Sequence, residues 1–435
     1  MRLSVSGVRV LVSCSLGGAG HFNPLRPVID SLCNSGDDVL VVVPPSLEAR
    51  VAECGYRVRV GEEPPAEQVA DIRDAIATAP QAMAAVVSER ELFGRLCTAA
   101  MLPAMEAAFA EWQPELVLRE TCEYAAAVAA ARRGIPQAQI AISQGETEAS
   151  ALGTAAPVLE AYESGVVGQI RSSPYLTRFP ASLDPTCYPD TRRFRELPRH
   201  DVAKLPEFWG SEAFPLAYLT FGSVTGYMPI AADVYPVALE AMKDLPLRVL
   251  LTVGNRTDIA GLGPIPENVH VEPWVSQDDI FREASLVICH GGSGTTFGAL
   301  AAGLPLVIVP LFADQFSNAR RVAAAGAGLL VEPAPGEDGR RPGLVPGDAA
   351  RVAEAVTTVL ADPGLHAGRG SDRARDGQHA SRGTSAGSSP RRTGLGHVSR
   401  AQRLRRTRPS TVGCNQEVRP CHCTLTRPIP ATTTS

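Results

Sequence analysis

Lysine is almost absent from this 435-residue chain, which contains only Lys204 and Lys243 beside 39 arginines. The formal net charge is −5, which argues against a nucleic-acid partner. No run of about 18 apolar residues occurs, so we expect no stable insertion into a membrane. Residues 1–7 carry one charge and lead directly into an apolar run, a pattern unlike that of a secretory signal peptide.

The ten cysteines are scattered and show no disulfide or zinc-binding spacing. Seven of them lie in apolar segments. The short motif Cys421-His422-Cys423 is too isolated to form a zinc site. Buried free thiols in a reducing compartment explain this distribution better, so we expect a cytoplasmic protein.

Two stretches of the chain alternate apolar β-branched runs with amphipathic segments, which predicts an α/β fold with parallel sheets. The first stretch has expected strands at 8–13, 38–43, 116–118 and 139–142, and expected helices at 24–35, 89–111 and 124–133. The second has expected strands at 216–220, 248–253, 268–273, 286–289, 305–309 and 328–331, and expected helices at 231–242, 295–302, 316–325 and 349–360. We therefore expect two Rossmann-like domains, residues 1–200 and 214–365, joined by a linker at 201–213.

Residues 366–435 differ from the rest, with 13 Arg, three acidic residues and almost no apolar periodicity. Such a segment cannot bury enough surface to offset the entropy lost on ordering, so one interpretation is a disordered basic tail. The change comes abruptly after Asp362-Pro363-Gly364, where a further helix would be expected. Our preferred hypothesis is therefore a frame-shifted or otherwise aberrant C-terminus, which resequencing of the gene would test.

The strongest functional signal is His290-Gly291-Gly292-Ser293-Gly294-Thr295, which follows an apolar strand and opens a helix. Small residues let the backbone approach a ligand closely, and a helix N-terminus presents unpaired N–H groups. The motif therefore favours an anion site suited to a diphosphate, with His290 and Thr295 as additional donors. A tight turn without a ligand is the structural alternative.

Three further elements accompany this motif. Trp274 ends a short strand and could stack on a nucleobase, although a core position is equally compatible with the sequence. Asp314-Gln315 follows a strand at the ligand-binding edge of the sheet, where a carboxylate and an amide could grip sugar hydroxyls. Taken alone, Asp314 is more often a helix cap. Gly222-Ser223 ends the first strand of the second stretch at the same edge and could touch phosphate.

These motifs resemble the donor signature of the family 1 glycosyltransferases, especially the bacterial enzymes that decorate antibiotics and other natural products. The resemblance covers about residues 8–362 and rests on Trp274-Val275-Ser276-Gln277, His290 to Thr295, Gly303-Leu304-Pro305, Asp314-Gln315 and Asn318. It implies a GT-B fold, in which two Rossmann-like domains face a cleft. The donor would bind the C-terminal domain and the acceptor the N-terminal domain.

The resemblance also implies a role for each donor residue. Trp274 would stack on the uracil or thymine ring, the 290–295 motif would hold the diphosphate, and Asp314 and Gln315 would hold the sugar. The helix terminus and His290 would neutralise the departing nucleotide, so we expect neither a metal ion nor a cofactor beyond the UDP- or dTDP-sugar. The expected donor-binding residues are Ser223, Trp274, Val275, His290, Gly292, Ser293, Gly294, Thr295, Asp314 and Gln315.

His21 lies in the Gly-rich loop after the first strand, where family 1 enzymes have their general base. Imidazole suits this role because its unperturbed pKa is about 6.5. A carboxylate usually orients such a base and stabilises its cation. In the family it is typically an Asp after a mid-domain strand, and the matching residue here is Glu120, with Glu123 as the second candidate.

The expected function is therefore an inverting, metal-independent transfer of a hexose or deoxyhexose from a UDP- or dTDP-sugar to a hydroxyl of a lipophilic small molecule. A polyketide, a macrolide or an aromatic natural product would fit, because residues 60–160 are rich in Ala, Met and Val. One alternative is a catalytically impaired GT-B protein that acts as a binding or auxiliary protein. Others are a sugar-nucleotide epimerase, a cell-wall lipid glycosyltransferase and a plain Rossmann dehydrogenase, although the loop at 16–21 lacks a clean GxGxxG.

Overall fold

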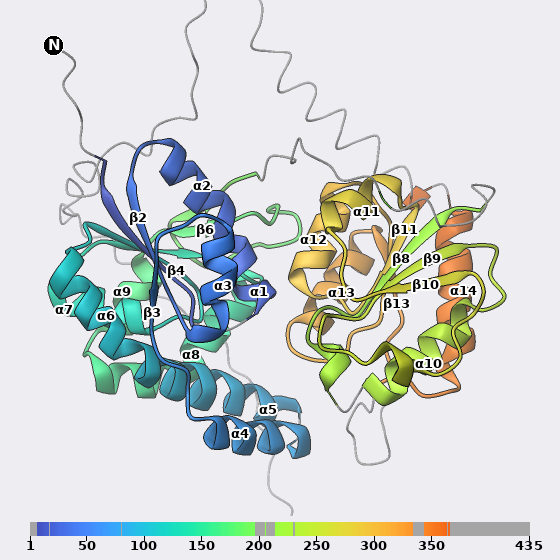
Figure 1. Cartoon of the computed structure of the whole chain (residues 1–435), viewed down its shortest axis with the longest axis horizontal. Coiled ribbons are helices and arrows are strands. Elements are labelled where there is room, and N and C mark those ends of the chain that lie inside the picture. The colour runs from blue at the N-terminus through green and yellow to red at the C-terminus, as the bar shows by residue number, and fades with distance from the viewer. Residues whose placement is uncertain are drawn as a thin grey trace, which may run out of the picture. The chain divides into compact units, whose positions relative to one another are not determined.

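The computed structural model describes residues 7–16, 18–79, 81–195, 205, 214–228, 231–333, 343–362 and 364–365. Their strands form two separate parallel sheets, each flanked by helices (Figure 1). This arrangement confirms the predicted α/β class. The predicted tail at 366–435, with its frame-shift hypothesis, and the predicted linker apart from Leu205 lie outside the described residues.

The first sheet has seven strands in the order β3-β2-β1-β4-β5-β6-β7, and each neighbouring pair is parallel. Its strands are β1 (Arg9–Ser13), β2 (Asp38–Val43), β3 (Val58–Val60), β4 (Leu116–Glu120), β5 (Gln137–Ile140), β6 (Tyr175–Thr177) and β7 (Thr191–Arg193). The accompanying helices are α1 (Ala19–Phe22), η1 (Asn23–Leu25), α2 (Arg26–Asn34), α3 (Pro45–Glu53), α4 (Ala66–Thr78), α5 (Gln81–Val86), η2 (Val87–Cys97), α6 (Thr98–Trp112), α7 (Ala125–Arg133), α8 (Gly145–Tyr162) and α9 (Val166–Ser172).

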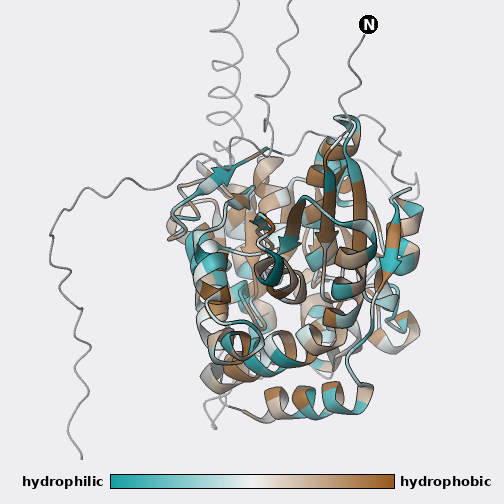
Figure 2. Ribbon diagram, turned by 90° about the vertical axis from the view of Figure 1, so that its left-hand side faces the viewer, coloured by the Kyte–Doolittle hydropathy of each residue, from teal (hydrophilic) through white to brown (hydrophobic). Residues whose placement is uncertain are grey.

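Helices cover both faces of this sheet. Successive side chains of a strand point to opposite sides, so neighbouring residues of one strand pack against different helices. Val10 and Val12 of β1 pack with α2 and α3, whereas Leu11 packs with α6 and α7 on the other face. Strands β1 and β2 are accordingly hydrophobic along most of their length, whereas the edge strand β7 is polar. Brown strands and helices with teal, polar stretches are visible in Figure 2. This double cover explains why the strands appear in the sequence as continuous apolar runs.

The second sheet has six strands in the order β10-β9-β8-β11-β12-β13, again all parallel. Its strands are β8 (Leu216–Thr220), β9 (Arg248–Thr252), β10 (Val269–Glu272), β11 (Leu286–Cys289), β12 (Leu306–Ile308) and β13 (Gly328–Leu330). Its helices are η3 (Thr225–Tyr227), α10 (Ala231–Met242), η4 (Ile259–Leu262), α11 (Gln277–Glu283), α12 (Ser293–Ala301), α13 (Gln315–Ala324) and α14 (Asp348–Ala361). Helices α10 and α14 pack on one face, and α11, α12 and α13 on the other.

The expected elements of both sheets occur within one to three residues of their predicted ends. Residues 143–200 showed little periodicity in the sequence, but the structure forms α8, α9, β6 and β7 there. Helix α8 was missed because it contains Pro157 and carries many small residues, which weaken the amphipathic pattern. The helical region expected at 89–111 is also not a single α-helix, because residues 87–97 adopt the wider π-helical winding of η2.

One helical stretch among the described residues, Met83–Trp112, is long and apolar enough to cross a membrane by length and composition. Within its apolar window, 44% of the residues are buried inside the protein. Its residues Met101 and Met105 pack under the first sheet, so the stretch serves as a core helix of the fold.

Candidate active site

Both functional signals lie at the point where the strand order of a sheet reverses. In the first sheet this point is between β1 and β4, where Ser13 lies opposite Arg119. In the second it is between β8 and β11, where Thr220 lies opposite Cys289. Open parallel sheets bind ligands outside the carboxyl ends of their strands at this switch point. At this switch point the first sheet holds His21 and Glu120. The second sheet holds Ser223 and His290 at its own switch point.

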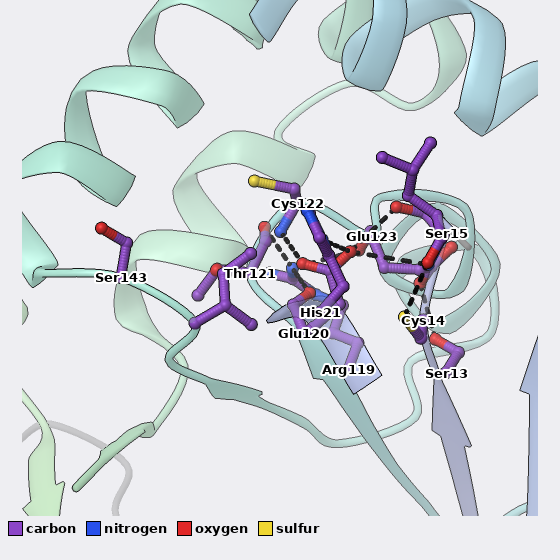
Figure 3. Close-up of polar contacts among 12 residues, drawn as sticks. Ser13, Cys14, Ser15, His21, Arg119, Glu120, Thr121, Cys122, Glu123 and Ser143 are labelled. Atoms are coloured by element: carbon purple, nitrogen blue, oxygen red, sulfur yellow. Dashed lines mark hydrogen bonds and ion pairs between the residues drawn. The ribbon is translucent and has the colours of Figure 1, made fainter. Parts of the chain in front are cut away.

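In the first sheet, His21 and Glu120 come together as the sequence predicted they would. His21 lies on α1, just after β1, and Glu120 is the last residue of β4. The imidazole Nδ1 is 3.3 Å from the Glu120 Oε1 (Figure 3). The Glu120 side chain is fully buried, whereas 20% of the His21 side chain remains exposed. In this pair the imidazole is therefore partly accessible to solvent, while the carboxylate beneath it is buried.

The Glu120 carboxylate is held by two further donors. The Ser15 hydroxyl donates to Oε1 at 2.8 Å, and the Cys122 amide donates to Oε2 at 2.6 Å. Burial acts to raise the pKa of Glu120, but the charge and hydrogen bond of His21, with the Cys122 amide and the Ser15 hydroxyl, lower that pKa below its ordinary value. Glu120 is therefore ionised near neutral pH and favours a proton on Nδ1 of His21.

Glu123, the second candidate carboxylate, has a different environment. Its side chain accepts the Ser13 hydroxyl at 2.7 Å and the amides of Ala125 and Ala126 at the start of α7. Burial raises the pKa of Glu123 to about 7. Its contacts secure the end of β1 and the beginning of α7, while Glu120 makes the contact with the imidazole.

Two residues that sequence analysis did not single out support this corner of the sheet. Arg119 is fully buried, and its Nη1 donates to the carbonyls of Glu120, Thr121 and Glu123. It therefore fixes the loop that carries the carboxylate. Ser15 holds the carboxylate itself. A charged residue inside an otherwise apolar strand was the available sequence signal for Arg119, while Ser15 offered none.

In the second sheet, glycine is required at the turn between β11 and α12. Gly291 has a φ of +89°, and a Cβ there would lie 2.8 Å from the Ile308 side chain. A Cβ on Gly292 would lie 2.4 Å from the His290 Nε2. The ring of His290 therefore packs against the turn it introduces, and its Cε1 and Nε2 also lie close to Gly222, just after β8. Helix α12 then starts at Ser293, so its first amides lie at this edge.

The sequence implied that His290 helps to neutralise the departing nucleotide, but the structure gives this histidine a lowered pKa. Burial lowers the pKa of His290 to about 4, and the attraction of Asp314 only partly opposes this shift. Its Nδ1 is buried and has no hydrogen-bond partner in the described part of the chain. At neutral pH the imidazole is uncharged, so it can offer a hydrogen bond to a phosphate but no formal positive charge.

A hydrogen-bond network joins the Gly turn to α13. Ser293 Oγ donates to Asp314 Oδ2 at 2.8 Å, and Asn318 Nδ2 donates to the same oxygen at 3.1 Å and to the Gly291 carbonyl at 2.8 Å. The hydroxyl of Ser143, which follows β5, also donates to Asp314 Oδ2 at 2.8 Å. Asp314 thus lies beside the turn, and its Oδ2 accepts three hydrogen bonds from the protein.

The side chains of Gln315 and Thr295 are engaged within the protein. Gln315 is buried, and its Oε1 accepts the amides of Leu311 and Phe312 at 2.8 and 2.9 Å. Thr295 is also buried, and its hydroxyl accepts Gln277 Nε2 at 2.8 Å. Both side chains therefore shape the loop and the helix start.

Other predicted donor residues are accessible at the same edge. Trp274, just after β10, leaves 59% of its surface exposed, which is unusual for so large an apolar side chain. Val275 beside it is half-buried, Gly292 is half-buried, and both Ser223 and Gly294 are exposed. An exposed Trp offers a flat face to a ring-shaped ligand, so the core position that the sequence also allowed is excluded.

Comparison with known proteins agrees with this geometry. The family model described as "Erythromycin biosynthesis protein CIII-like, C-terminal domain" matches residues 237–383. The chain is 30% identical over 338 residues to L-demethylnoviosyl transferase of Streptomyces niveus, covering 74% of this chain and 85% of that protein. It is 31% identical over 331 residues to elloramycin glycosyltransferase of Streptomyces olivaceus, covering 71% and 82%.

Solved structures show the same fold. Spinosyn rhamnosyltransferase in complex with spinosyn aglycone matches with a TM-score of 0.68 and 23% identity, covering 86% of this chain and 96% of that one. Its complex with thymidine diphosphate matches with a TM-score of 0.66. The two parallel sheets are thus arranged as in a GT-B protein. The chain therefore belongs to the family of antibiotic-tailoring glycosyltransferases, and its fold is GT-B.

Proposed function

We propose that this glycosyltransferase moves a hexose or deoxyhexose from a UDP- or dTDP-sugar to a hydroxyl of a lipophilic natural product, with inversion at the anomeric carbon. The observation that carries the proposal is the pairing of His21 with the buried Glu120 at 3.3 Å. An imidazole oriented by a carboxylate is the arrangement that a general base requires. His21 lies at the carboxyl edge of the first sheet, where an acceptor would bind.

In the proposed reaction, Nε2 of His21 takes the proton of the acceptor hydroxyl. The acceptor oxygen forms a bond to C1 of the sugar while the bond between C1 and the phosphate oxygen breaks. The electron pair of that bond leaves with the nucleoside diphosphate. Attack from the face opposite the leaving group inverts C1, through an oxocarbenium-like transition state. Glu120 keeps Nδ1 protonated and stabilises the imidazolium that forms.

The donor would bind at the switch point of the second sheet. The amides at the start of α12 and the neutral imidazole of His290 would donate to the diphosphate, and Trp274 would stack on the base. Asp314 would accept the sugar hydroxyls. The thymidine diphosphate bound by the spinosyn rhamnosyltransferase supports a deoxynucleotide donor, whereas stacking by Trp274 suits uracil and thymine alike.

The acceptor is inferred from two observations. The spinosyn rhamnosyltransferase has been solved with an aglycone, and the relatives are named for transfers in antibiotic chemistry. In this chain, the apolar helical stretch Met83–Trp112 directly precedes β4, the strand that ends at Glu120. We also infer a cytoplasmic location, which the free thiols of the seven described cysteines support.

A panel of donors would test the proposal. The full chain is incubated with UDP- and dTDP-sugars and a lipophilic phenolic acceptor, with EDTA present, and the products are read by mass spectrometry. We expect an acceptor mass increased by one sugar, with a β-linkage from an α-linked donor by NMR. Absence of product from every donor would overturn the transfer, retention at C1 would overturn inversion, and rescue by Mg²⁺ alone would overturn metal independence.

A further inference from the structure

The π-helical segment η2 places an aromatic ring against the imidazole of His21. Residues 87–97 interrupt a run of helix that extends from α5 into α6, and the rings of Phe93 and His21 are stacked with centroids 5.5 Å apart and planes 26° apart. π-Helical turns are uncommon and frequently occur at functional sites. This ring contact is separate from the hydrogen bond between His21 and Glu120.

The local structure shows why Phe93 is held in this position. The Thr98 hydroxyl donates to the Phe93 carbonyl five residues earlier at 3.0 Å, a spacing that matches π winding. Gly94 is buried, and a Cβ there would lie 3.2 Å from the Ala155 side chain of α8. The absence of a side chain at Gly94 therefore lets η2 approach α8 closely. The Phe93 ring also packs on the apolar cluster that contains Tyr124.

The Phe93 ring restricts rotation of the His21 imidazole, which the hydrogen bond to Glu120 alone does not prevent. The hydrogen bond to Glu120 fixes where Nδ1 lies, but the imidazole plane can still turn about that bond. A ring packed on one face of the imidazole limits this rotation, and therefore fixes the direction of the Nε2 lone pair. An aromatic face is also attractive to the imidazolium that forms when His21 takes a proton.

We propose that Phe93 is a positioning residue that sets the ring plane of His21 for proton abstraction. The inference rests on the proposed role of His21 as general base. It predicts that the ring of residue 93, rather than its apolar volume, matters for turnover. Phe93→Leu keeps an apolar side chain and removes the stack, whereas Phe93→Tyr keeps the stack.

The kinetic test compares these two variants. We expect Phe93→Leu to lower kcat by about three- to tenfold, with the acceptor KM and the nucleotide Kd within about twofold of the wild type. Phe93→Tyr should retain kcat within about twofold. A Phe93→Leu enzyme with wild-type kcat, or a Phe93→Tyr enzyme as slow as Phe93→Leu, would overturn the proposal.

A spectroscopic test separates this inference from the proposed function. The Hε1 resonance of His21 is followed by NMR of histidine-labelled protein and assigned by its loss in His21→Asn. We expect an upfield ring-current shift in the wild type and in Phe93→Tyr, and its loss in Phe93→Leu. The matched control is Phe109→Leu, a buried phenylalanine of α6 that faces Arg133, which should lower Tm and leave this resonance in place. An unchanged resonance in Phe93→Leu would refute the contact even if no acceptor were ever turned over.

Discussion

Two histidines lie at the switch points of the two sheets, one after β1 and one after β11, and their surroundings differ. His21 follows the first strand of its sheet and contacts a buried carboxylate whose pKa is lowered. His290 follows the fourth strand of its sheet, and burial lowers its own pKa to about 4. One switch point thus holds an imidazole beside a carboxylate, and the other holds a buried imidazole that is uncharged at neutral pH.

The difference comes from what stands on the adjacent strand end. Beside β1, the end of β4 supplies Glu120, a buried carboxylate whose Oε1 lies 3.3 Å from the His21 Nδ1. Beside β11, the end of β8 supplies Gly222, whose missing side chain admits the His290 ring but gives it no charge. The electrostatic difference between His21 and His290 therefore comes from burial and from the groups beside each ring.

The largest effect on activity is expected from replacing His21. His21→Ala should lower kcat by about 10²- to 10⁴-fold, because no other group would accept the hydroxyl proton. Nucleotide affinity by calorimetry should stay unchanged, since the donor site belongs to the second sheet. His270→Gln, at a half-exposed histidine paired with Glu272, is the matched control and should keep full activity. Equal turnover of His21→Ala and the wild type would remove His21 from the mechanism.

The carboxylates of the first sheet offer the next largest contrast. Glu120→Gln should lower kcat by about a hundredfold, because the amide can neither stabilise the imidazolium nor enforce its tautomer. Glu123→Gln should lower Tm, since Glu123 holds the start of α7, but should retain kcat within about threefold. Steady-state kinetics and thermal unfolding of the two variants test the assignment. A reversal of their kinetic effects would make Glu123 the partner of the base.

In the second sheet, Trp274→Ala should weaken binding of the nucleotide sugar about 5- to 100-fold, the cost of losing one stacked base. The exposed position of Trp274 means that little stability should be lost with the ring. Trp274→Phe, which keeps an aromatic face, is the control and should recover much of the affinity. Calorimetry that finds no change in Trp274→Ala would reject the stacking role.

The smallest effect is expected from the charge of His290. Because its pKa is about 4, His290 is neutral from about pH 6 to 8, so affinity for a nucleotide sugar should be flat over that range. His290→Gln keeps a neutral donor and should bind within about threefold of the wild type, whereas His290→Ala should bind more weakly. Affinity that rises as the pH falls from 8 to 6 in the wild type, but not in His290→Gln, would restore the cationic role.

The sequence predicted the core strands well, because double burial makes them continuous apolar runs. It also identified His21, Glu120 and the turn at 290–295 as the principal groups at the switch points. It missed α8, whose small residues and Pro157 conceal its amphipathic face, and it missed the π winding of η2. Neither feature has a local signature, since both depend on how closely neighbouring helices approach.

For the predicted donor residues, the sequence named the segments but could not assign the surroundings of each side chain. Gln315 and Thr295 belong to the signature, yet their side chains are buried and bonded within the protein. Trp274 was equally compatible with the core and with a ligand platform until its exposure was seen. Burial depends on residues distant in the chain, so a local pattern cannot assign it.

What the sequence determined by itself is the order of strands and helices and the residue types at their ends, because periodicity and glycine turns are local properties. The tertiary structure decided which side chains are in contact. Glu120 contacts His21, Glu123 accepts amides at the start of α7, and the Phe93 ring stacks on the His21 imidazole. The physical reason is that pKa and ring orientation depend on desolvation and on contacts between segments about 100 residues apart, as for His21 and Glu120. Such contacts exist only once the sheet has brought β1 and β4 side by side.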